Sequence, residues 1–329
     1  MKIAILVGNS LRKTLINEKT MAQLQALGEV VLCEGDEITI DAAKQLLQGA
    51  DVAVTSWGSP RMEAELLDCC PQLKLVCHAA GSVKGIVSDE LYRRGVRVIS
   101  SARVLSEGVS DTALGLTIAA CKNFFAFNTQ MHQGGWVSDY SVVTEMFGIT
   151  VGVVGCGFAG AKYAKLLQAF DLDVLVYDPL KTAEEIAQLG ARKAELDELF
   201  ANSDVVSLHA PELESTRHIV NEQRLGLMKK GSILINTARA SLIDTEALKK
   251  ALRSGTLKYA CLDVYDKEPL DDADELRTIP NCILTPHIAG AANNGKQKIG
   301  AHVLQEIQRM LNGEALISEI TQEMLSTIA

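Results

Sequence analysis

The stretch Thr150–Pro179, TVGVVGCGFAGAKYAKLLQAFDLDVLVYDP, decides the fold of this chain. Its apolar, β-branched run Val151–Val154 predicts a buried parallel strand, which ends in the pattern GxGxxG over Gly155–Gly160. An alanine- and leucine-rich segment over 159–170 then predicts a helix, and a second apolar run ends in Asp178. The stretch therefore predicts a strand, a tight turn, a helix and a second strand.

The residues at the turn suit a dinucleotide. Gly155 permits the sharp turn, Gly157 lets a pyrophosphate approach the backbone, and Gly160 lets the helix lie close to its strand. Free N–H groups at the start of the helix then face the phosphates. Asp178 lies 18 residues past Gly160, where a carboxylate can accept both adenosine ribose hydroxyls and repels a 2′-phosphate. We therefore predict NAD rather than NADP as the cofactor; the alternative is a glycine turn in another βαβ protein, with Asp178 as a helix cap.

Length and composition limit the remaining possibilities. A chain of 329 residues is long enough for two domains of roughly 150 residues each. The formal net charge of −9 argues against nucleic acid or an anionic membrane as a main partner. No apolar run reaches the ~18 to 20 residues that span a bilayer. The eight cysteines lack CxxC spacing, which favours reduced thiols in a cytoplasmic protein, although the Cys69–Cys70 pair has no assigned role.

Strands and helices alternate along most of the chain. Five strand-like runs separated by helices occupy the first hundred residues, and six more follow from Val151. This alternation predicts an α/β fold with two doubly wound parallel sheets, each with ligands at the carboxyl ends of its strands. We expect the helix at about 294–312 to return to the first domain. The predicted domains are thus 1–101 plus 289–329, which binds substrate, and an inserted cofactor domain, 102–288.

Four functional side chains follow the later strands of the inserted domain. Arg239 comes after SILIN, Asp263 ends YACLDV and is followed by Glu268, and His287 comes after CILT. Because the carboxyl ends of parallel strands meet at one edge of a sheet, these side chains can converge there. No residue group has the spacing of a metal site, so no metal is predicted.

Four motifs carry a resemblance to a known family. They are NTARASLID over 236–244, LDVYDKEPL over 262–270, LTPH over 284–287, and SLHAP over 207–211 with TRH over 216–218. In their order along the chain they resemble the D-isomer-specific 2-hydroxyacid dehydrogenases, of a phosphoglycerate dehydrogenase-like type without a regulatory domain. The resemblance covers nearly the whole chain. It implies a Rossmann NAD-binding domain inserted into a flavodoxin-like substrate domain.

The resemblance also implies residue roles. His287 is the expected acid and base, and Glu268 holds its far ring nitrogen and favours the imidazolium, so that reduction is expected at lower pH and oxidation at higher pH. Arg239 is the expected two-pronged donor to the substrate carboxylate and its oxo oxygen. Asp263 is the expected partner of the nicotinamide carboxamide. Further cofactor contacts are expected from Phe158, Ala159, Pro211, Thr216, Thr237 and Ala238, whereas His209 and His218 are expected to be structural.

The substrate side departs from the family pattern. In the loop whose N–H groups are expected to grip the carboxylate, this chain has Ala80, Gly81 and Ser82. Phosphoglycerate-type members place arginines around the substrate phosphate where this chain has Trp57 and His78. Loss of two charge-assisted hydrogen bonds, roughly 1.5–3 kcal/mol each, disfavours a phosphorylated substrate. We therefore predict an apolar or bulkier 2-oxo acid, with the natural acid, the physiological direction and the pathway left open.

Two other functions and an assembly also follow from the resemblance. One alternative is an NAD-sensing binding protein similar to the C-terminal-binding corepressors, and another is a dehydrogenase of the formate or phosphite type. The segment 124–147 resembles the arm through which family members form two-fold dimers, so a homodimer is predicted.

Overall fold

The computed structural model describes residues 1–290 and 293–328 and divides into two compact units. Unit 1 comprises Met1–Leu105 and Ala291–Ala329, and unit 2 comprises Ser106–Gly290. Each boundary falls a few residues after the corresponding predicted border. Residues 291, 292 and 329, which belong to the predicted segment 289–329, lie outside the described residues.

Unit 1 is built on a five-stranded, wholly parallel sheet with the order β2-β1-β3-β4-β5. Its strands are β1 (Lys2–Leu6), β2 (Glu29–Leu32), β3 (Val52–Thr55), β4 (Leu75–His78) and β5 (Arg97–Ser100). These are the five predicted strands. Because β1, β3, β4 and most of β5 are buried, they consist of continuous apolar runs rather than alternating ones.

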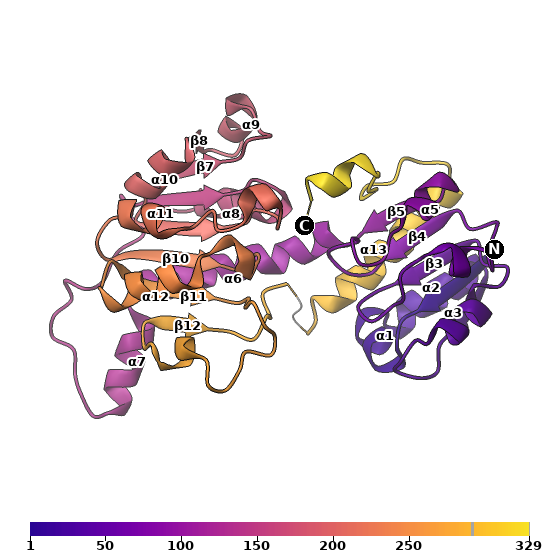
Figure 1. Ribbon diagram of the computed structural model, residues 1–329, viewed down its shortest axis with the longest axis horizontal. Coiled ribbons are helices and arrows are strands. Elements are labelled where there is room, and N and C mark those ends of the chain that lie inside the picture. The colour runs from indigo at the N-terminus through magenta and orange to yellow at the C-terminus, as the bar shows by residue number, and fades with distance from the viewer. Residues whose placement is uncertain (291–292, 329) are drawn as a thin grey trace. The chain divides into compact units, whose positions relative to one another are not determined.

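Helices cover both faces of the sheet in unit 1 (Figure 1). They are α1 (Asn9–Leu15), α2 (Glu18–Leu27), α3 (Ile40–Leu47), α4 (Ala64–Leu67), α5 (Asp89–Arg93) and α13 (Lys296–Leu311). One core joins the sheet to α3, α4 and α5, and the other joins it to α1, α2 and α13. α1 and α2 are separate helices, because the Asn17 side chain accepts the N–H of Thr20 and starts a new helix.

The chain after α13 lies along β5 as an antiparallel extension. Glu319 pairs with Ile99, and its carboxylate accepts two hydrogen bonds of 2.6 Å from the Arg97 guanidinium. Glu306 of α13 is fully buried and accepts the N–H groups of Ile317 and Ser318. These contacts fix the C-terminal segment to unit 1.

Unit 2 contains a seven-stranded parallel sheet with the order β12-β11-β10-β9-β6-β7-β8. Its strands are β6 (Thr150–Val154), β7 (Asp173–Tyr177), β8 (Arg192–Lys193), β9 (Val205–Leu208), β10 (Ser232–Asn236), β11 (Leu257–Leu262) and β12 (Cys282–Leu284). The prediction of six strands missed β8, whose two charged residues at the sheet edge carry no apolar signal. The order reverses between β6 and β9, so the turn after β6 lies at the topological switch point, where ligands bind in such sheets.

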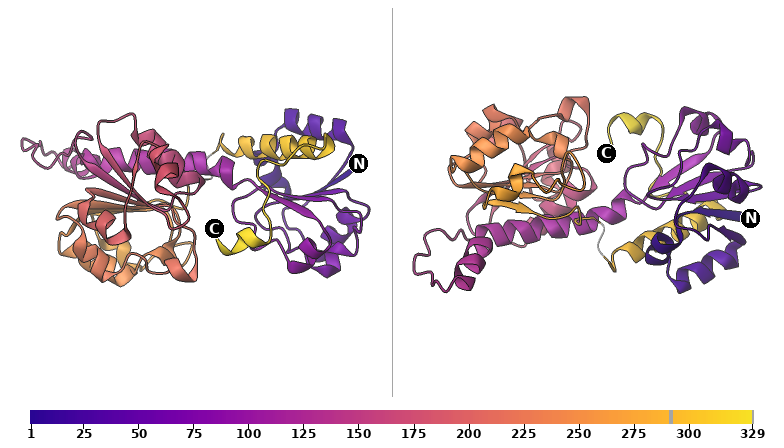
Figure 2. Two further views of the ribbon diagram at one scale, coloured as in Figure 1. Left: turned by 90° about the horizontal axis from the view of Figure 1, so that it is seen from above. Right: turned by 60° about the horizontal axis from the view of Figure 1, so that its bottom comes forward.

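Two helical layers enclose this sheet, as two further views show (Figure 2). The helices are α6 (Ala102–Cys121), α7 (Phe124–His132), α8 (Phe158–Leu167), α9 (Ala183–Ala187), α10 (Leu196–Asn202), α11 (Glu222–Leu227) and α12 (Thr245–Arg253). One core joins the sheet to α10, α11 and α12, and the other joins it to α6, α8 and α9. None of the helices formed by the described residues combines the length and apolar character that crossing a bilayer requires.

The helical segment between the two sheets is divided in two. α6 ends at Cys121, and Asn123 takes a left-handed conformation with φ of 59° before α7 begins. α7 and the following loop project beyond the sheet of unit 2 (Figures 1 and 2). We call residues 122–147 the arm.

Candidate active site and cofactor-binding turn

The glycine turn after β6 has three positions with different steric demands. Gly155 has φ of 93°, and a Cβ there would lie 2.6 Å from the Ala210 nitrogen. A Cβ on Gly160 would lie 2.0 Å from the Gly155 carbonyl oxygen. At Gly157, by contrast, a Cβ would meet nothing within 4 Å. Gly155 and Gly160 are therefore required by the fold, whereas Gly157 leaves space open beside the turn.

The start of α8 has free backbone donors. Gly157 is its N-cap and has no side chain to cap the first N–H groups. Phe158, the first helical residue, is exposed, and Ala159 is anchored by its carbonyl, which accepts the Ser110 hydroxyl at 2.9 Å. A helix end with unpaired N–H groups and a positive dipole is suited to an anionic group.

Asp178 follows β7 and is joined to the glycine turn. Its carboxylate accepts the N–H of Cys156 at 2.7 Å and the N–H of Leu180 at 2.8 Å. Since an ionised carboxylate has about four acceptor positions, it can hold the turn and still accept further donors.

The predicted pairing of His287 with Glu268 is present in unit 2. His287 Nδ1 lies 2.6 Å from Glu268 Oε2, and Glu268 Oε1 accepts the N–H of Tyr265 at 3.0 Å. Burial raises the pKa of Glu268, but the hydrogen bonds from His287 and Tyr265, with the charge of Arg239, outweigh it and hold the pKa below its ordinary value. Glu268 is therefore a carboxylate at neutral pH, and Nε2 of His287 is left for another partner.

Arg239 lies close enough to Glu268 for its charge to act on that carboxylate. The residue is half-buried, and one guanidinium N–H bonds the Ala238 carbonyl at 2.6 Å. Asn236 fixes the backbone here, because its amide donates to the Arg239 carbonyl and its oxygen accepts the Ala238 N–H. The remaining donors of the guanidinium fork can serve a carboxylate.

Asp263 follows β11 and is hydrogen-bonded to the residues around His287. It is 0% exposed, and its oxygens accept the Thr285 hydroxyl at 2.5 Å and the N–H groups of Ile288 and Ala289 at 2.9 and 2.8 Å. These bonds hold the backbone on both sides of His287, which has a positive φ of 52°. The structure thus shows that Asp263 holds the turn that carries His287, and its expected contact with the nicotinamide carboxamide stays a prediction.

The other predicted cofactor residues surround the same ends of the strands. Thr216 donates its hydroxyl to the Pro211 carbonyl at 2.7 Å and so closes the loop after β9. Thr237 follows β10, and its hydroxyl is buried without a hydrogen-bond partner. Such a buried hydroxyl costs free energy unless a ligand or a water molecule forms a hydrogen bond with it.

The five residues predicted to contact substrate all belong to unit 1. Trp57 is 45% exposed, whereas His78 is only 3% exposed and hydrogen-bonds the Thr55 hydroxyl through Nδ1 at 3.0 Å. Burial lowers the pKa of His78 to about 4, against a hydrogen bond with the Ser82 backbone that raises it. Ala80 is buried, and the Gly81 carbonyl accepts the Ser100 hydroxyl. His78 is therefore neutral and supports the 80–82 loop from beneath.

Sequence reasoning missed three supporting residues. They are Asn236, Tyr265 and Thr285, whose side chains or backbone hold Arg239, Glu268 and Asp263 in place. Each lies inside or beside a quoted motif, yet its hydrogen bonds join segments that only the folded sheet brings together.

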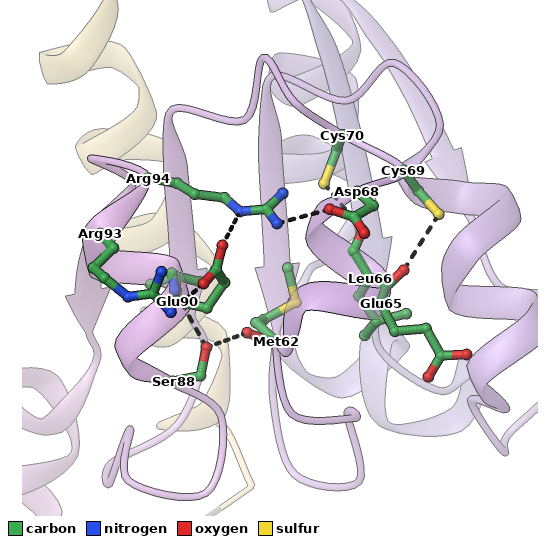
Figure 3. Close-up of polar contacts among 11 residues, drawn as sticks. Met62, Glu65, Leu66, Asp68, Cys69, Cys70, Ser88, Glu90, Arg93 and Arg94 are labelled. Carbon is green, nitrogen blue, oxygen red and sulfur yellow. Dashed lines mark hydrogen bonds and ion pairs between the residues drawn. The ribbon is translucent and has the colours of Figure 1, made fainter.

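Other titratable groups outside this set have structural surroundings. His209 Nε2 lies 2.9 Å from the Ser207 hydroxyl, and burial lowers the pKa of His209 to about 4. Cys69 and Cys70 donate to carbonyls of the preceding turn and point apart (Figure 3). Burial, and then Cys69, raise the pKa of Cys70 to about 11, so its thiol is neutral at ordinary pH. No group of three or more metal-ligating side chains occurs within residues 1–290 and 293–328.

Comparison with known proteins places this geometry in a family. Residues 114–289 match the profile of the "D-isomer specific 2-hydroxyacid dehydrogenase, NAD binding domain". A glyoxylate reductase of Korarchaeum cryptofilum is 31% identical over 83% of this chain and 83% of its own. A D-3-phosphoglycerate dehydrogenase of Methanocaldococcus jannaschii is 30% identical over 91% of this chain, which spans only 56% of that relative.

A solved structure shows the same similarity. A protein of Thermus thermophilus is 28% identical, with a TM-score of 0.77 over 98% of this chain and 100% of that one. The profile match covers more than half of the 329 residues. This chain therefore belongs to the D-isomer specific 2-hydroxyacid dehydrogenase family and is an NAD-dependent oxidoreductase.

Proposed function

We propose that the protein reduces a 2-oxo acid to the D-2-hydroxy acid with NADH, with His287 as the acid, Glu268 as its positioning partner and Arg239 as the substrate-binding cation. The observation that carries the proposal is the 2.6 Å contact between His287 and Glu268, with the Arg239 charge acting on the same carboxylate. An acid, an orienting carboxylate and a cation at adjacent strand ends are what reduction of a 2-oxo acid requires.

The residues present fit an NAD molecule. The open space at Gly157 and the uncapped start of α8 suit a pyrophosphate, and the buried, unpaired Thr237 hydroxyl is free to complete a bond with a ligand. Asp178 is the proposed acceptor of the ribose hydroxyls, with Phe158, Ala159, Pro211, Thr216 and Ala238 along the proposed groove. When bound, NADH supplies the hydride that reduces C2 of the substrate.

The protein's own residues manage charge and protons. As negative charge develops on the substrate oxygen, the imidazolium of His287 donates its Nε2 proton to that oxygen, and Glu268 stabilises the charged ring until then. Arg239 donates to the substrate carboxylate and to its oxo oxygen and so fixes which face of C2 is presented. In oxidation the neutral imidazole takes the proton back, which favours higher pH.

For the substrate we propose an unphosphorylated 2-oxo acid. Trp57 supplies an exposed apolar surface, and the neutral, buried His78 supplies no cation for a phosphate. The backbone N–H groups of Ala80, Gly81 and Ser82 are the proposed carboxylate donors. The related glyoxylate reductase acts on a small 2-oxo acid, and Trp57 favours a larger side chain than glyoxylate has.

A kinetic screen tests this function. NADH oxidation is followed with glyoxylate, pyruvate, hydroxypyruvate, 4-methyl-2-oxopentanoate, phenylpyruvate and phosphohydroxypyruvate, each beside an Arg239→Lys and a His287→Asn variant. We expect kcat/KM to be highest for an unphosphorylated acid with an apolar side chain and to fall at least about 100-fold in His287→Asn. A clear preference for the phosphorylated acid contradicts the substrate class, and turnover by His287→Asn equal to wild type contradicts the mechanism.

We also propose that the chain forms a homodimer through the arm. Within unit 2 the arm exposes large apolar side chains, with Trp136 76% and Phe147 73% exposed. Apolar surface of this kind, gathered on a projecting segment, is typical of an interface with a second copy. A cytoplasmic location is proposed on the basis of the eight free cysteines, and cell fractionation tests it.

A further inference from the structure

A cavity of about 170 Å³ lies at the amino-terminal edge of the sheet in unit 2. The residues that line it include Cys121, Thr144, Asp204, Lys229, Lys230 and Ser232. Strands β9 and β10 begin here, at Val205 and Ser232, whereas the glycine turn follows the carboxyl end of β6. Because all strands of this sheet are parallel, the cavity lies at the opposite edge of the sheet from the cofactor turn.

Ser232 supplies an unused donor to this cavity. The residue is 3% exposed, and its hydroxyl is buried without a hydrogen-bond partner, although its backbone N–H bonds the Lys229 carbonyl. A buried hydroxyl without a hydrogen-bond partner costs free energy. A ligand that accepts a hydrogen bond from the Ser232 hydroxyl removes this cost.

The charges around the cavity favour an anion. Asp204 is balanced within the protein, because Lys229 Nζ lies 2.9 Å from one oxygen and the Thr150 N–H lies 2.8 Å from the other. Lys230 is exposed and has no ion pair among the described residues, so the lining has a positive excess in a chain whose net charge is −9.

The part of the cavity wall that contains Cys121 and Thr144 adds no negative charge. Burial raises the pKa of Cys121 to about 11; Lys258 and Lys122 oppose the rise and Asp204 adds to it. The Cys121 thiol is therefore neutral at ordinary pH. Its carbonyl accepts the Thr144 N–H at 2.9 Å, which joins the end of α6 to the arm at the cavity wall.

We propose that this cavity binds a small oxyanion, a phosphate or a carboxylate, through the Lys230 and Lys229 ammonium groups and the Ser232 hydroxyl. Such a ligand links the 229–232 turn to the base of the arm through the wall that holds Cys121 and Thr144. The site is separate from the proposed catalytic residues, so it can be occupied while the cofactor is bound.

Thermal unfolding in the presence of saturating NADH tests the proposal, because NADH occupies the phosphate-binding turn at α8. Inorganic phosphate, acetate and citrate are titrated against chloride at equal ionic strength. We expect a saturable rise in Tm, since a ligand bound only by the folded state stabilises it by mass action. A rise with phosphate alone identifies a phosphate site, and a rise with the carboxylates alone identifies a carboxylate site.

Two variants and a control make the test specific. Ser232→Ala removes a hydroxyl that has no partner, so we expect its Tm without oxyanion to be unchanged or slightly higher. We expect Ser232→Ala and Lys230→Gln to weaken oxyanion binding at least about tenfold, while Lys250→Gln, the same charge change on the exposed face of α12, leaves it unchanged. Equal responses in all variants, or no saturable rise beyond chloride, overturns the proposal. A lower Tm of Ser232→Ala with an unaltered oxyanion response also overturns it, because the hydroxyl then binds only water.

Discussion

The conformation of His287 is the most constrained feature at the scale of single residues. A non-glycine residue with φ of 52° is strained, and such strain persists only where neighbouring contacts enforce it. Asp263 enforces it by holding Ile288, Ala289 and Thr285, while Glu268 fixes the ring itself. The backbone and the ring are thus fixed by two different carboxylates.

Glu268→Gln separates these two effects. Glutamine keeps a hydrogen-bond acceptor for His287 but removes the negative charge that stabilises the imidazolium. We expect kcat/KM for reduction to fall by about tenfold or more. Steady-state kinetics of wild type and variant check this, with Glu275→Gln, an exposed acid in the same unit, as the control. An unchanged kcat/KM in Glu268→Gln contradicts the proposed role of the charge.

His78 gives a prediction about stability and pH. Its pKa is lowered by burial from 6.5 to about 4, so above pH 6.5 the ring is neutral in both states and has no effect. Between pH 6.5 and 4 His78 binds a proton in the unfolded chain but not in the folded chain. The free energy of unfolding therefore falls by up to about 3 kcal/mol as the pH is lowered.

His78→Asn keeps an acceptor for the Thr55 hydroxyl and removes the titration. We therefore expect the variant's free energy of unfolding to lose less than that of wild type between pH 6.5 and 4. Urea unfolding across this range measures it, and His132→Asn, on the exposed α7, is the control. If the free energy of unfolding falls equally with pH in wild type and in His78→Asn, folding does not lower the pKa of His78.

At the scale of elements, the glycines of the turn after β6 divide into two kinds. Gly160 is needed for α8 to pack against β6, because a Cβ there would lie only 2.0 Å from the Gly155 carbonyl oxygen. Gly157 caps the same helix with open space around it. Identical substitutions at these two positions therefore affect different properties.

We expect Gly160→Ala to lower the free energy of unfolding by about 3 kcal/mol or more, and Gly157→Ala to lower it by less than about 1 kcal/mol. The methyl group at Gly157 should instead raise the Kd for NADH by at least about tenfold, because it fills the space proposed for the pyrophosphate. Urea unfolding and a fluorescence titration with NADH measure the two properties. Unchanged NADH affinity in Gly157→Ala places the pyrophosphate elsewhere.

The sequence was informative wherever a local pattern determines structure. Apolar runs separated by helices predicted eleven of the twelve strands and the parallel pairing, whereas β8 is too short and too charged to be recognised. The breaks at Asn17 and Asn123 depend on a cap and on a left-handed residue within otherwise helical segments. Motif order predicted the Glu268–His287 contact. The burial of Asp263 and of His78 depends on partners 22 to 26 residues away in sequence, so no local pattern reveals it.

At the scale of the whole molecule, the arm raises the question of assembly. Its exposed aromatic and apolar residues contrast with the nearly complete burial of large apolar side chains in the two cores of unit 2. The exposed residues of the arm are Phe124, Met131, Trp136, Tyr140, Val142 and Phe147. Lys258 anchors the arm to β11 by donating to the Val142 carbonyl at 2.6 Å, so the apolar surface is presented on a supported segment.

A two-fold interface buries each of these side chains twice, once in each copy, so a single substitution acts at two places. We expect wild type to sediment with twice the mass of one chain and Trp136→Asp/Phe147→Asp to sediment as a monomer, because a buried carboxylate without a partner is strongly disfavoured. Ile40→Asp is the control for adding a carboxylate at an exposed apolar position outside the arm, because it lies in the first turn of α3, where an acid is tolerated. A monomeric wild type contradicts the dimer while leaving the catalytic proposal intact, because His287, Glu268 and Arg239 all belong to one chain.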